Sequence, residues 1–288
     1  METIRFSKTE CGVDFLINVL NNPEPGQFFK AEYHNTNFFE IVFIRKGNGR
    51  LFLNDTIINI KNDSIIFISP FQKKKWDIEK HSLDVSLLVF QEDFLNEFFS
   101  DKLFTYRLSY FYQNQYPLIL NLPKEQIRSF CNILKEVKVE LKATNFDSAH
   151  IIRSLIYYLL QRLNRLYGSS YNLSYQIDAS NHAYAFKRLM ETHIRQKQRI
   201  NEYCELLGIS RITINSAVKK QFNTTATDLL KKRLLSEIKT ELIYSGKNVS
   251  EIAYEFGYSD PNHLMRFFKK QTGKTPSEFI STYQNDSL

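Results

Sequence analysis

The side chains best suited to chemistry lie in one short stretch near the C-terminal end, GYSDPNHLMRFFKK, residues 257–270. If the part after Pro261 is helical, polar and basic side chains gather on one face, and leucine and phenylalanine gather on the other. The planar fork of Arg266 can donate two hydrogen bonds to guanine O6 and N7, and Asn262 can pair with adenine in a similar way. This face therefore has the chemistry needed to contact base edges.

The outward residues near the start of this helix are the candidate base contacts, namely Asn262, His263, Met265 and Arg266. Lys269 and Lys270 follow one turn later. We expect these two lysines to contact phosphates, which position a protein on DNA without reading its sequence. The alternative for the two lysines is a solvated helix face.

Turn and capping signals surround this helix. Ser250 is a candidate N-cap for a preceding short helix, and Gly257 can take the positive φ that often ends a helix. Ser259 or Asp260 can cap the next helix, whose first turn tolerates Pro261. The pattern is helix, turn, helix. Taken alone, it fits an ordinary pair of antiparallel helices with solvated charges equally well.

The same pattern occurs further upstream in INEYCELLGISRITINSAVKKQF, residues 200–222. Its turn at 208–210 matches the turn at 257–259 at an offset of 49 residues. Beyond the turn, Lys219 and Lys220 match the lysine pair of the later copy at an offset of 50. Two copies of one pattern argue against chance and indicate a pair of helix-turn-helix motifs.

The outward face of the first copy carries less charge. It offers the candidate base contacts Ile212, Thr213, Asn215 and Ser216 and the candidate phosphate contacts Lys219 and Lys220. Ser216 stands where Arg266 stands in the second copy, so the first copy lacks a guanidinium fork for guanine. Ile212 and Thr213 can contact thymine methyl groups instead, which favours A/T-rich recognition.

A stretch with helical periodicity, TDLLKKRLLSEIKTELIYSG at 227–246, separates the two copies. About nineteen helical residues span roughly 28 Å. Successive major grooves on one face of B-DNA lie about 34 Å apart. Once the width of each motif is allowed for, a rigid helix of this length can hold two recognition helices in successive grooves.

Charge is unevenly distributed along the 288 residues. The net charge is +7 at pH 7, and the pI is about 9.1. Residues 1–175 contain 21 Lys and Arg against 19 Asp and Glu, whereas residues 176–288 contain 17 against 12. The shorter C-terminal part is the more basic one, as expected of a part that binds a polyanion.

Cysteine usage and apolar runs indicate the compartment. Cys11, Cys131 and Cys204 are odd in number and far apart, so they predict neither a disulfide framework nor a zinc knuckle. The first residues do not form a basic start followed by an apolar run, and the apolar runs are too short to span a bilayer. We expect a cytoplasmic protein without a membrane partner.

The N-terminal part has a different character. Between residues 38 and 90, short runs rich in branched and aromatic residues alternate with turn signals, which predicts a small antiparallel β-barrel or sandwich. Periodicity then predicts helices over 124–142 and 149–168, the second one ended by Gly168. The polar, serine-rich segment 169–181 is the expected linker.

The second of these helices is apolar on more than one side, so it needs a second partner. One candidate is the β domain itself. The other is a twin subunit, which would make the helical hairpin the dimerisation element. The side chains expected at that interface are Ile152, Leu155, Ile156, Leu159 and Leu163.

The β domain shows no catalytic constellation in its sequence. None of the six histidines is paired at metal-ligand spacing, so we expect no metal, no cofactor and no catalysis. A pocket in the barrel can hold a small apolar or amphipathic effector. At its rim, Lys73, Lys74, Lys75 and Trp76 can attract an acidic effector, and the alternative for this segment is a solvated loop.

A family resemblance joins these features. Residues 182–284 resemble the DNA-binding domain of AraC/XylS transcription regulators, through LLGIS at 206–210, VSEIAYEFGYSDPNHLMRFFKKQTGKTPSEF at 249–279 and the helix between them. The resemblance implies a seven-helix domain with two motifs that binds bacterial promoter DNA. More loosely, EIVFIRKGNGRLFLND at 40–55 and DSIIFISPFQ at 63–72 resemble the cupin-like effector and dimerisation domain of such regulators.

We therefore expect an α+β chain with a cupin-like antiparallel β-barrel and a helical hairpin, followed by an all-α domain with two helix-turn-helix motifs. The expected parts are an effector domain at 1–122, the hairpin at 123–168, the linker at 169–181 and the DNA-binding domain at 182–288, with motifs at about 200–222 and 249–271.

The expected function is that of a DNA-binding transcription activator, controlled by a small-molecule effector. Its expected partners are double-stranded promoter DNA, RNA polymerase, the effector and a second copy of the chain. One alternative is a cupin-type enzyme that its helical domain recruits to DNA. The other is a regulator without an effector, controlled by its abundance or by a protein partner.

Overall fold

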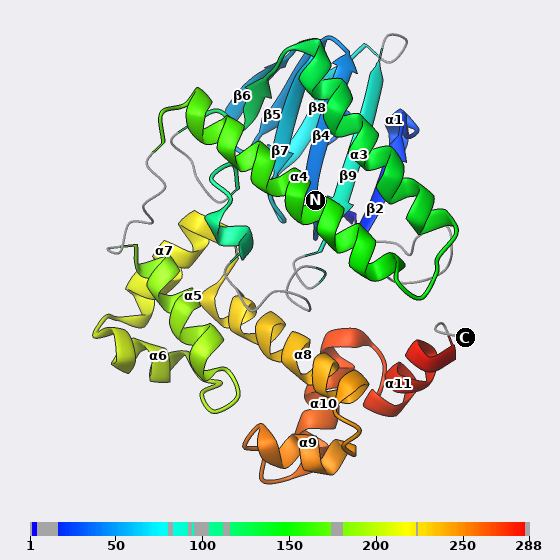
Figure 1. Cartoon of the computed structure of the whole chain (residues 1–288). Helices are drawn as coiled ribbons and strands as arrows, with labels where there is room; N and C mark the ends of the chain where they lie inside the picture. Colours follow the sequence, from blue (N-terminus) through cyan, green and yellow to red (C-terminus); the bar gives the residue numbers. More distant parts are fainter. Residues whose placement is uncertain are drawn as a thin grey trace. The chain divides into compact units, whose positions relative to one another are not determined.

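The structure is a computed structural model, and it describes residues 2–4, 17–79, 83–91, 94, 104–111, 116–173, 181–222 and 224–285. The chain divides into two compact units, Met1–Ile177 (unit 1) and Asp178–Leu288 (unit 2) (Figure 1). The division falls within the segment 169–181 expected as the linker, of which residues 174–180 lie outside the described part.

The described strands of unit 1 form two five-stranded sheets. Sheet A has the order β1 (Glu2–Ile4), β3 (His34–Thr36), β8 (Lys74–Ile78), β5 (Gly49–Leu53) and β6 (Thr56–Ile60). Sheet B has the order β10 (Ile119–Asn121), β7 (Ser64–Ile68), β4 (Phe39–Lys46), β9 (Asp84–Phe90) and β2 (Ile17–Asn21). Neighbouring strands are antiparallel except for β1 and β3, which are parallel.

Alternation along the central strand β4 shows how the layers pack. Val42 and Ile44 lie in an apolar core shared with side chains of sheet A, such as Leu51. Ile41 and Phe43 point the other way, into a second core shared with helices. Unit 1 is thus a sandwich of two sheets that do not close into a barrel, and sheet B is buried on both faces.

Two helices cover the outer face of sheet B, α3 (Lys124–Lys142) and α4 (Ser148–Ser170) (Figure 1). A short helix α1 (Pro25–Phe28) and a 3-10 turn η2 (Phe104–Arg107) complete the described elements of unit 1. The expectation that Gly168 ends α4 is wrong. Gly168 is buried within the helix, which continues to Ser170 and is capped at Tyr171.

The expectation that α4 packs against a twin subunit through its apolar stripe is also wrong. Ile152, Ile156, Leu159 and Leu163 are fully buried in the core that α3, α4 and sheet B share, and Leu155 packs against the same core. The second partner of this apolar helix is therefore the β domain of its own chain.

Unit 2 is built from helices. They are α5 (His182–His193), α6 (Ile200–Leu207), α7 (Arg211–Phe222), α8 (Ala226–Tyr244), α9 (Val249–Glu255), α10 (Pro261–Thr272) and α11 (Pro276–Asn285). The long helix α8 contacts α6, α7, α9 and α11. Figure 1 shows α6 and α7 toward one end of α8 and α9 and α10 toward the other.

Candidate DNA interface and effector site

The second motif begins with a reciprocal cap. The Asn248 side chain accepts hydrogen bonds from Ser250 N and Glu251 N, and the Glu251 carboxylate accepts from Asn248 N. The N-cap of α9 is therefore Asn248, and the expectation of Ser250 is wrong by two residues. Gly257 has a φ of 73°, a left-handed geometry that costs little only in glycine.

Asp260 is the N-cap of α10. Its Oδ1 accepts from Asn262 N at 2.8 Å, and Pro261 occupies the first turn. Leu264 and Phe268 of this helix are buried, which fixes the opposite face outward. The four candidate base contacts on that face, Asn262, His263, Met265 and Arg266, are all exposed, and so are Lys269 and Lys270.

Arg266 makes one weak contact within its own helix. Its Nε donates to the Asn262 carbonyl oxygen at 3.3 Å. This contact uses neither of the terminal nitrogens, which are the groups that would donate to O6 and N7 of a guanine. Arg266 therefore lies exposed on the outward face of α10, with both terminal nitrogens outside this contact.

The first motif repeats this architecture. Gly208 has a φ of 65° and ends α6, and Ser210 Oγ accepts from Thr213 N at 3.1 Å at the start of α7. Ile214 and Val218 are buried in α7, as Leu264 and Phe268 are in α10. The repeat seen in the sequence is therefore a structural repeat.

The outward face of α7 carries most of the expected residues. Thr213, Ser216, Lys219 and Lys220 are exposed, and Ile212 is 82% exposed. A projecting isoleucine at this position suits van der Waals contact with a thymine methyl group.

Asn215 has a different place. It is only partly exposed, and its Oδ1 accepts a hydrogen bond from Ala226 N at 3.0 Å. This bond satisfies one of the free backbone donors at the start of α8. Asn215 thus joins the recognition helix α7 to α8 through its amide oxygen, and only its NH2 group is left for a base contact.

A chain of ion pairs that the sequence did not reveal runs along α8. Arg233 donates to Glu191 of α5 at 2.6 Å and to Glu237 at 2.5 Å. Glu237 also accepts from Arg195 at 3.0 Å, and Arg195 donates to Glu241 at 2.6 Å. These pairs connect α5, the segment after α5 and α8.

The chain of ion pairs extends to the second motif. Lys247 lies 3.9 Å from Glu241 and donates to Glu255 of α9 at 2.5 Å. Gln198, just before α6, donates to the Phe256 carbonyl oxygen at 2.5 Å. Polar contacts therefore tie both motifs to α8 and to each other, which holds the two recognition helices in one body.

Burial and charge act in opposite directions on Glu237. Burial alone would raise the pKa of this carboxyl group, but the nearby Arg233 and Arg195 outweigh burial and lower the pKa below its ordinary value of 4.5. Glu237 is therefore ionised at neutral pH and keeps its ion pairs.

A polar cluster lies inside the sandwich of unit 1. Lys74 of sheet A pairs with Glu40 of sheet B, and Lys74 Nζ also donates to Thr36 Oγ1 at 3.1 Å. Thr36 Oγ1 donates to Glu40 Oε1 at 2.5 Å. Burial lowers the pKa of Lys74, and Glu40 opposes this effect. A buried ion pair of this kind is costly to desolvate and is weak evidence for a purely stabilising role.

Two buried polar atoms next to this cluster have no hydrogen-bond partner, His34 Nε2 and Trp76 Nε1. His34 stands opposite Lys74 in the register of β3 and β8, and Trp76 follows two residues later on the same face. His34 Nδ1 donates to the Glu32 carbonyl oxygen at 3.0 Å, and burial lowers the pKa of this histidine. In the neutral ring, Nε2 is then an acceptor, whereas Trp76 Nε1 is a donor.

The expectation that Lys73–Trp76 forms the rim of a pocket is wrong for half of these residues. Lys74 and Trp76 are buried, because they point from β8 into the sandwich. Lys73 and Lys75 lie outside, over the ring of Tyr33 at 4.2 and 5.2 Å. Lys74 is thus part of an internal cluster and cannot attract a ligand at the surface.

Among the residues that the structure describes, no three His, Cys, Asp or Glu side chains are grouped so that they could hold a metal ion. No helix in this part of the chain is both long and apolar enough to cross a membrane.

Comparison with known proteins gives matches to both units. Residues 203–282 match a helix-turn-helix domain, and residues 19–160 match an AraC-like ligand binding domain. The transcriptional activator RhaR of Mannheimia succiniciproducens is 27% identical over 251 residues, which are 87% of each chain. RhaS of the same organism is 22% identical over 280 residues, 90% of this chain and 92% of that one.

Among solved structures, ToxT from Vibrio cholerae is similar over 92% of this chain and 97% of its own. The sequence identity is 16% and the TM-score is 0.41.

Proposed function

Because the chain belongs to the AraC/XylS family of transcription regulators, we propose that α7 and α10 enter successive major grooves of one promoter site and that an effector in unit 1 controls this binding. One observation supports the DNA-binding geometry: two equivalent helices, joined through α8, each expose an outward face that ends in a pair of lysines. An α-helix fits the major groove of B-DNA, and the two faces divide into base contacts and phosphate contacts.

The second motif supplies the stronger base readout in this proposal. Arg266 donates to guanine, and Asn262 supports it. In the first motif, Ile212 and Thr213 contact thymine methyl groups, and Ser216 adds a short polar contact. The exposed lysines at the ends of the two helices contact phosphates.

Sequencing of the DNA fragments that purify with the full chain tests this geometry. We expect one asymmetric site with two conserved blocks about one helical turn apart, one block rich in A and T and the other containing guanine. A single block, or no enriched sequence, would contradict docking through both helices.

For the effector, we propose a small molecule bound at the polar cluster of the sandwich. Its support is the pair of buried atoms without partners, because buried polar groups normally make hydrogen bonds. A ligand hydroxyl group could donate to His34 Nε2 and accept from Trp76 Nε1. A molecule with hydroxyl groups therefore fits this site better than the simple acid that the lysine run suggested.

Native mass spectrometry of the full chain, purified from its host, tests this site. We expect a bound small molecule that Trp76→Phe releases, because this change removes the N–H group but keeps a large apolar ring. Tyr33→Phe is the matched control, since it removes one polar atom from the outer side of the sheet. If the Trp76→Phe protein retained the molecule, the proposed site would be wrong.

We also propose that the protein is an activator that contacts RNA polymerase and acts as a homodimer in the cytoplasm. Its relatives RhaR and RhaS are transcriptional activators. With the core face of α4 buried, a dimer surface on the hairpin has to use exposed side chains such as Phe146, Ile151 and Tyr158. Sedimentation of the wild type and of Phe146→Ser/Tyr158→Ser measures this, and a wild-type monomer at micromolar concentration would reject the dimer.

A further inference from the structure

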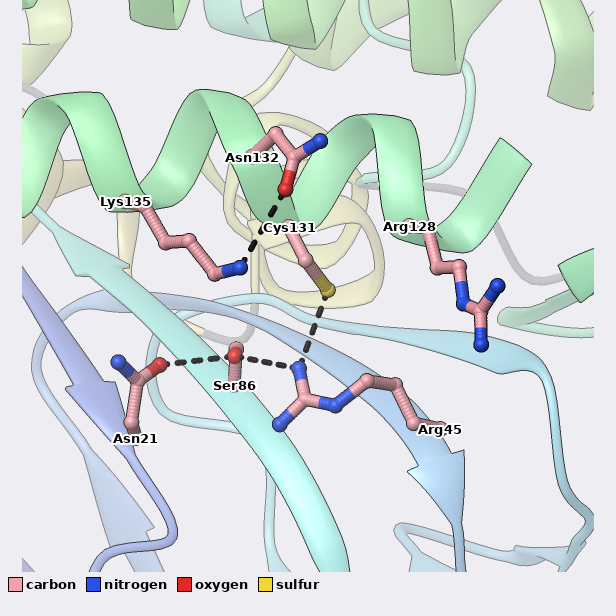
Figure 2. Close-up of a pocket in the computed structure, with 7 residues that line it drawn as sticks. All are labelled: Asn21, Arg45, Ser86, Arg128, Cys131, Asn132 and Lys135. Atoms are coloured by element: carbon pink, nitrogen blue, oxygen red, sulfur yellow. Dashed lines mark hydrogen bonds between the residues drawn. The ribbon is translucent and has the colours of Figure 1, made fainter. Parts of the chain in front are cut away.

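A pocket of about 430 Å³ lies between α3 and the helix-covered face of sheet B (Figure 2). Its lining residues are Asn21, Arg45, Ser86, Arg128, Cys131, Asn132 and Lys135. They come from β2, β4, β9 and α3. The pocket is therefore separate from the polar cluster, which lies on the opposite face of sheet B.

Arg45 forms the fixed floor of this pocket. Its Nε and Nη2 donate to the two carboxylate oxygens of Asp84 at 3.0 and 2.5 Å. Its Nη1 donates to Ser86 Oγ at 2.8 Å and to Cys131 Sγ at 3.1 Å. Four of the five guanidinium N–H groups are thus engaged, and one is left to donate to a ligand.

Hydrogen bonds also orient the two amide side chains. Ser86 Oγ donates to Asn21 Oδ1 at 2.8 Å, and Lys135 Nζ donates to Asn132 Oδ1 at 3.4 Å. Because each amide oxygen has a donor, the NH2 group of each asparagine is the end that remains to bind a ligand. Both amides then act as donors.

The opening of the pocket is lined by positively charged side chains. Arg128, Asn132 and Lys135 follow at helical spacing on one face of α3, and all three are exposed. Figure 2 shows Arg128 and Cys131 pointing from α3 toward the sheet. Within the part of the chain that the structure describes, no hydrogen bond or ion pair engages the Arg128 guanidinium, and Lys135 has no acidic partner.

The lining residues therefore offer cations and N–H donors but no carboxylate. Arginine and lysine bind phosphate and carboxylate groups through charge-assisted hydrogen bonds. The volume lies in the range of pockets that bind small molecules and exceeds what inorganic phosphate would fill. We propose that this pocket binds a small organic anion with a phosphate or carboxylate group, held between α3 and the strands.

This site does not depend on the effector proposed for the sandwich. Ligand groups would contact Arg128 and Lys135 of α3 and Asn21 and Arg45 of sheet B at the same time. A bound anion would therefore link α3 to the sheet, which makes the pocket a second place where a small molecule can act on unit 1.

Isothermal titration calorimetry of the full chain at constant ionic strength tests the proposal. Glucose 6-phosphate and citrate are the phosphate and carboxylate probes, and glucose is the neutral control. We expect saturable binding of at least one of the two anions and no binding of glucose. Comparing the two anions identifies which acidic group the pocket prefers. If neither anion bound, or if glucose bound equally well, the proposal would be overturned.

Matched charge variants locate the binding. Arg128→Gln/Lys135→Gln should weaken anion binding at least about tenfold, because two charge-assisted contacts are lost. Lys124→Gln/Lys138→Gln removes the same charge from α3 outside the pocket, and should change affinity less than about twofold. Circular dichroism checks that both proteins keep their helices. Equal weakening by the two double variants would show a bulk charge effect and overturn the site.

Discussion

Replacing Arg233 by alanine should selectively destabilise unit 2. The Arg233 side chain is 6% exposed, and its two partners, Glu191 and Glu237, are 10% and 13% exposed. Removing one partner of a buried ion pair costs about 3–5 kcal/mol, because a charge stays buried without compensation. Glu191 keeps Lys187 at 3.3 Å, and Glu237 keeps Arg195. We therefore expect a loss near the lower end, about 3 kcal/mol.

The chain offers an internal reference for this measurement. Trp76 is the only tryptophan, and it is buried in unit 1. In urea denaturation, its fluorescence reports the unfolding of unit 1, whereas far-UV circular dichroism also reports the helices of unit 2. Arg233→Ala should move the helical transition to lower urea and leave the fluorescence transition in place.

Arg50→Ala is the matched control. Arg50 pairs with Asp77 at 2.5 Å, but both side chains are more than half exposed, so the loss should be at most about 1 kcal/mol. An Arg233→Ala protein whose helical transition coincides with that of the wild type would refute the reasoning that this network holds the two motifs on α8.

Three further predictions concern the same unit. If four lysines each neutralise one phosphate, a plot of log binding constant against log salt concentration should have a slope of about −3 to −4 for the full chain on its promoter. Fluorescence anisotropy measures this slope, which should become flatter after alanine replaces Lys219, Lys220, Lys269 and Lys270. Asn215→Ala should cost about 1 kcal/mol by the loss of its bond to Ala226 N, measured by urea denaturation, and should leave the selected DNA sequence unchanged. The pKa of Glu237 is lowered in the folded state, so the ionised carboxylate stabilises the fold above about pH 4.5. This stabilisation is lost as pH falls through the folded pKa. Glu237→Gln should therefore flatten the acid side of a plot of unfolding free energy against pH.

Local patterns in the sequence were sufficient for much of the fold. The helix α3 has the predicted bounds of 124–142, because its apolar stripe is regular and Pro123 precedes it. The runs of branched residues form strands β4, β5, β6, β7 and β9, near the positions that the sequence predicted. The two motifs were found because their glycine turns repeat, and glycine is the residue that takes positive φ without strain.

The features that were missed depend on partners far away in the sequence. The strand β8 begins in a run of three lysines, which is typical of a solvated loop, and Lys74 can point inward only because Glu40 of the other sheet pairs with it. From the sequence alone, Glu191 and Arg233 look like surface charges, because it does not show that α5 packs beside α8 and brings the two together. The apolar excess of α4 correctly indicated a second partner, but local spacing could not distinguish sheet B from another subunit.

The most direct test of the central claim is a randomised-site selection with the wild type, Arg266→Ala and Lys270→Ala. If Arg266 contacts a guanine, its loss should weaken binding to the preferred site by about 1–3 kcal/mol and abolish the preference at one position. Lys270→Ala should weaken binding to all sequences alike and leave the selected motif unchanged. An Arg266→Ala protein that selects the wild-type motif at every position would contradict base readout by α10.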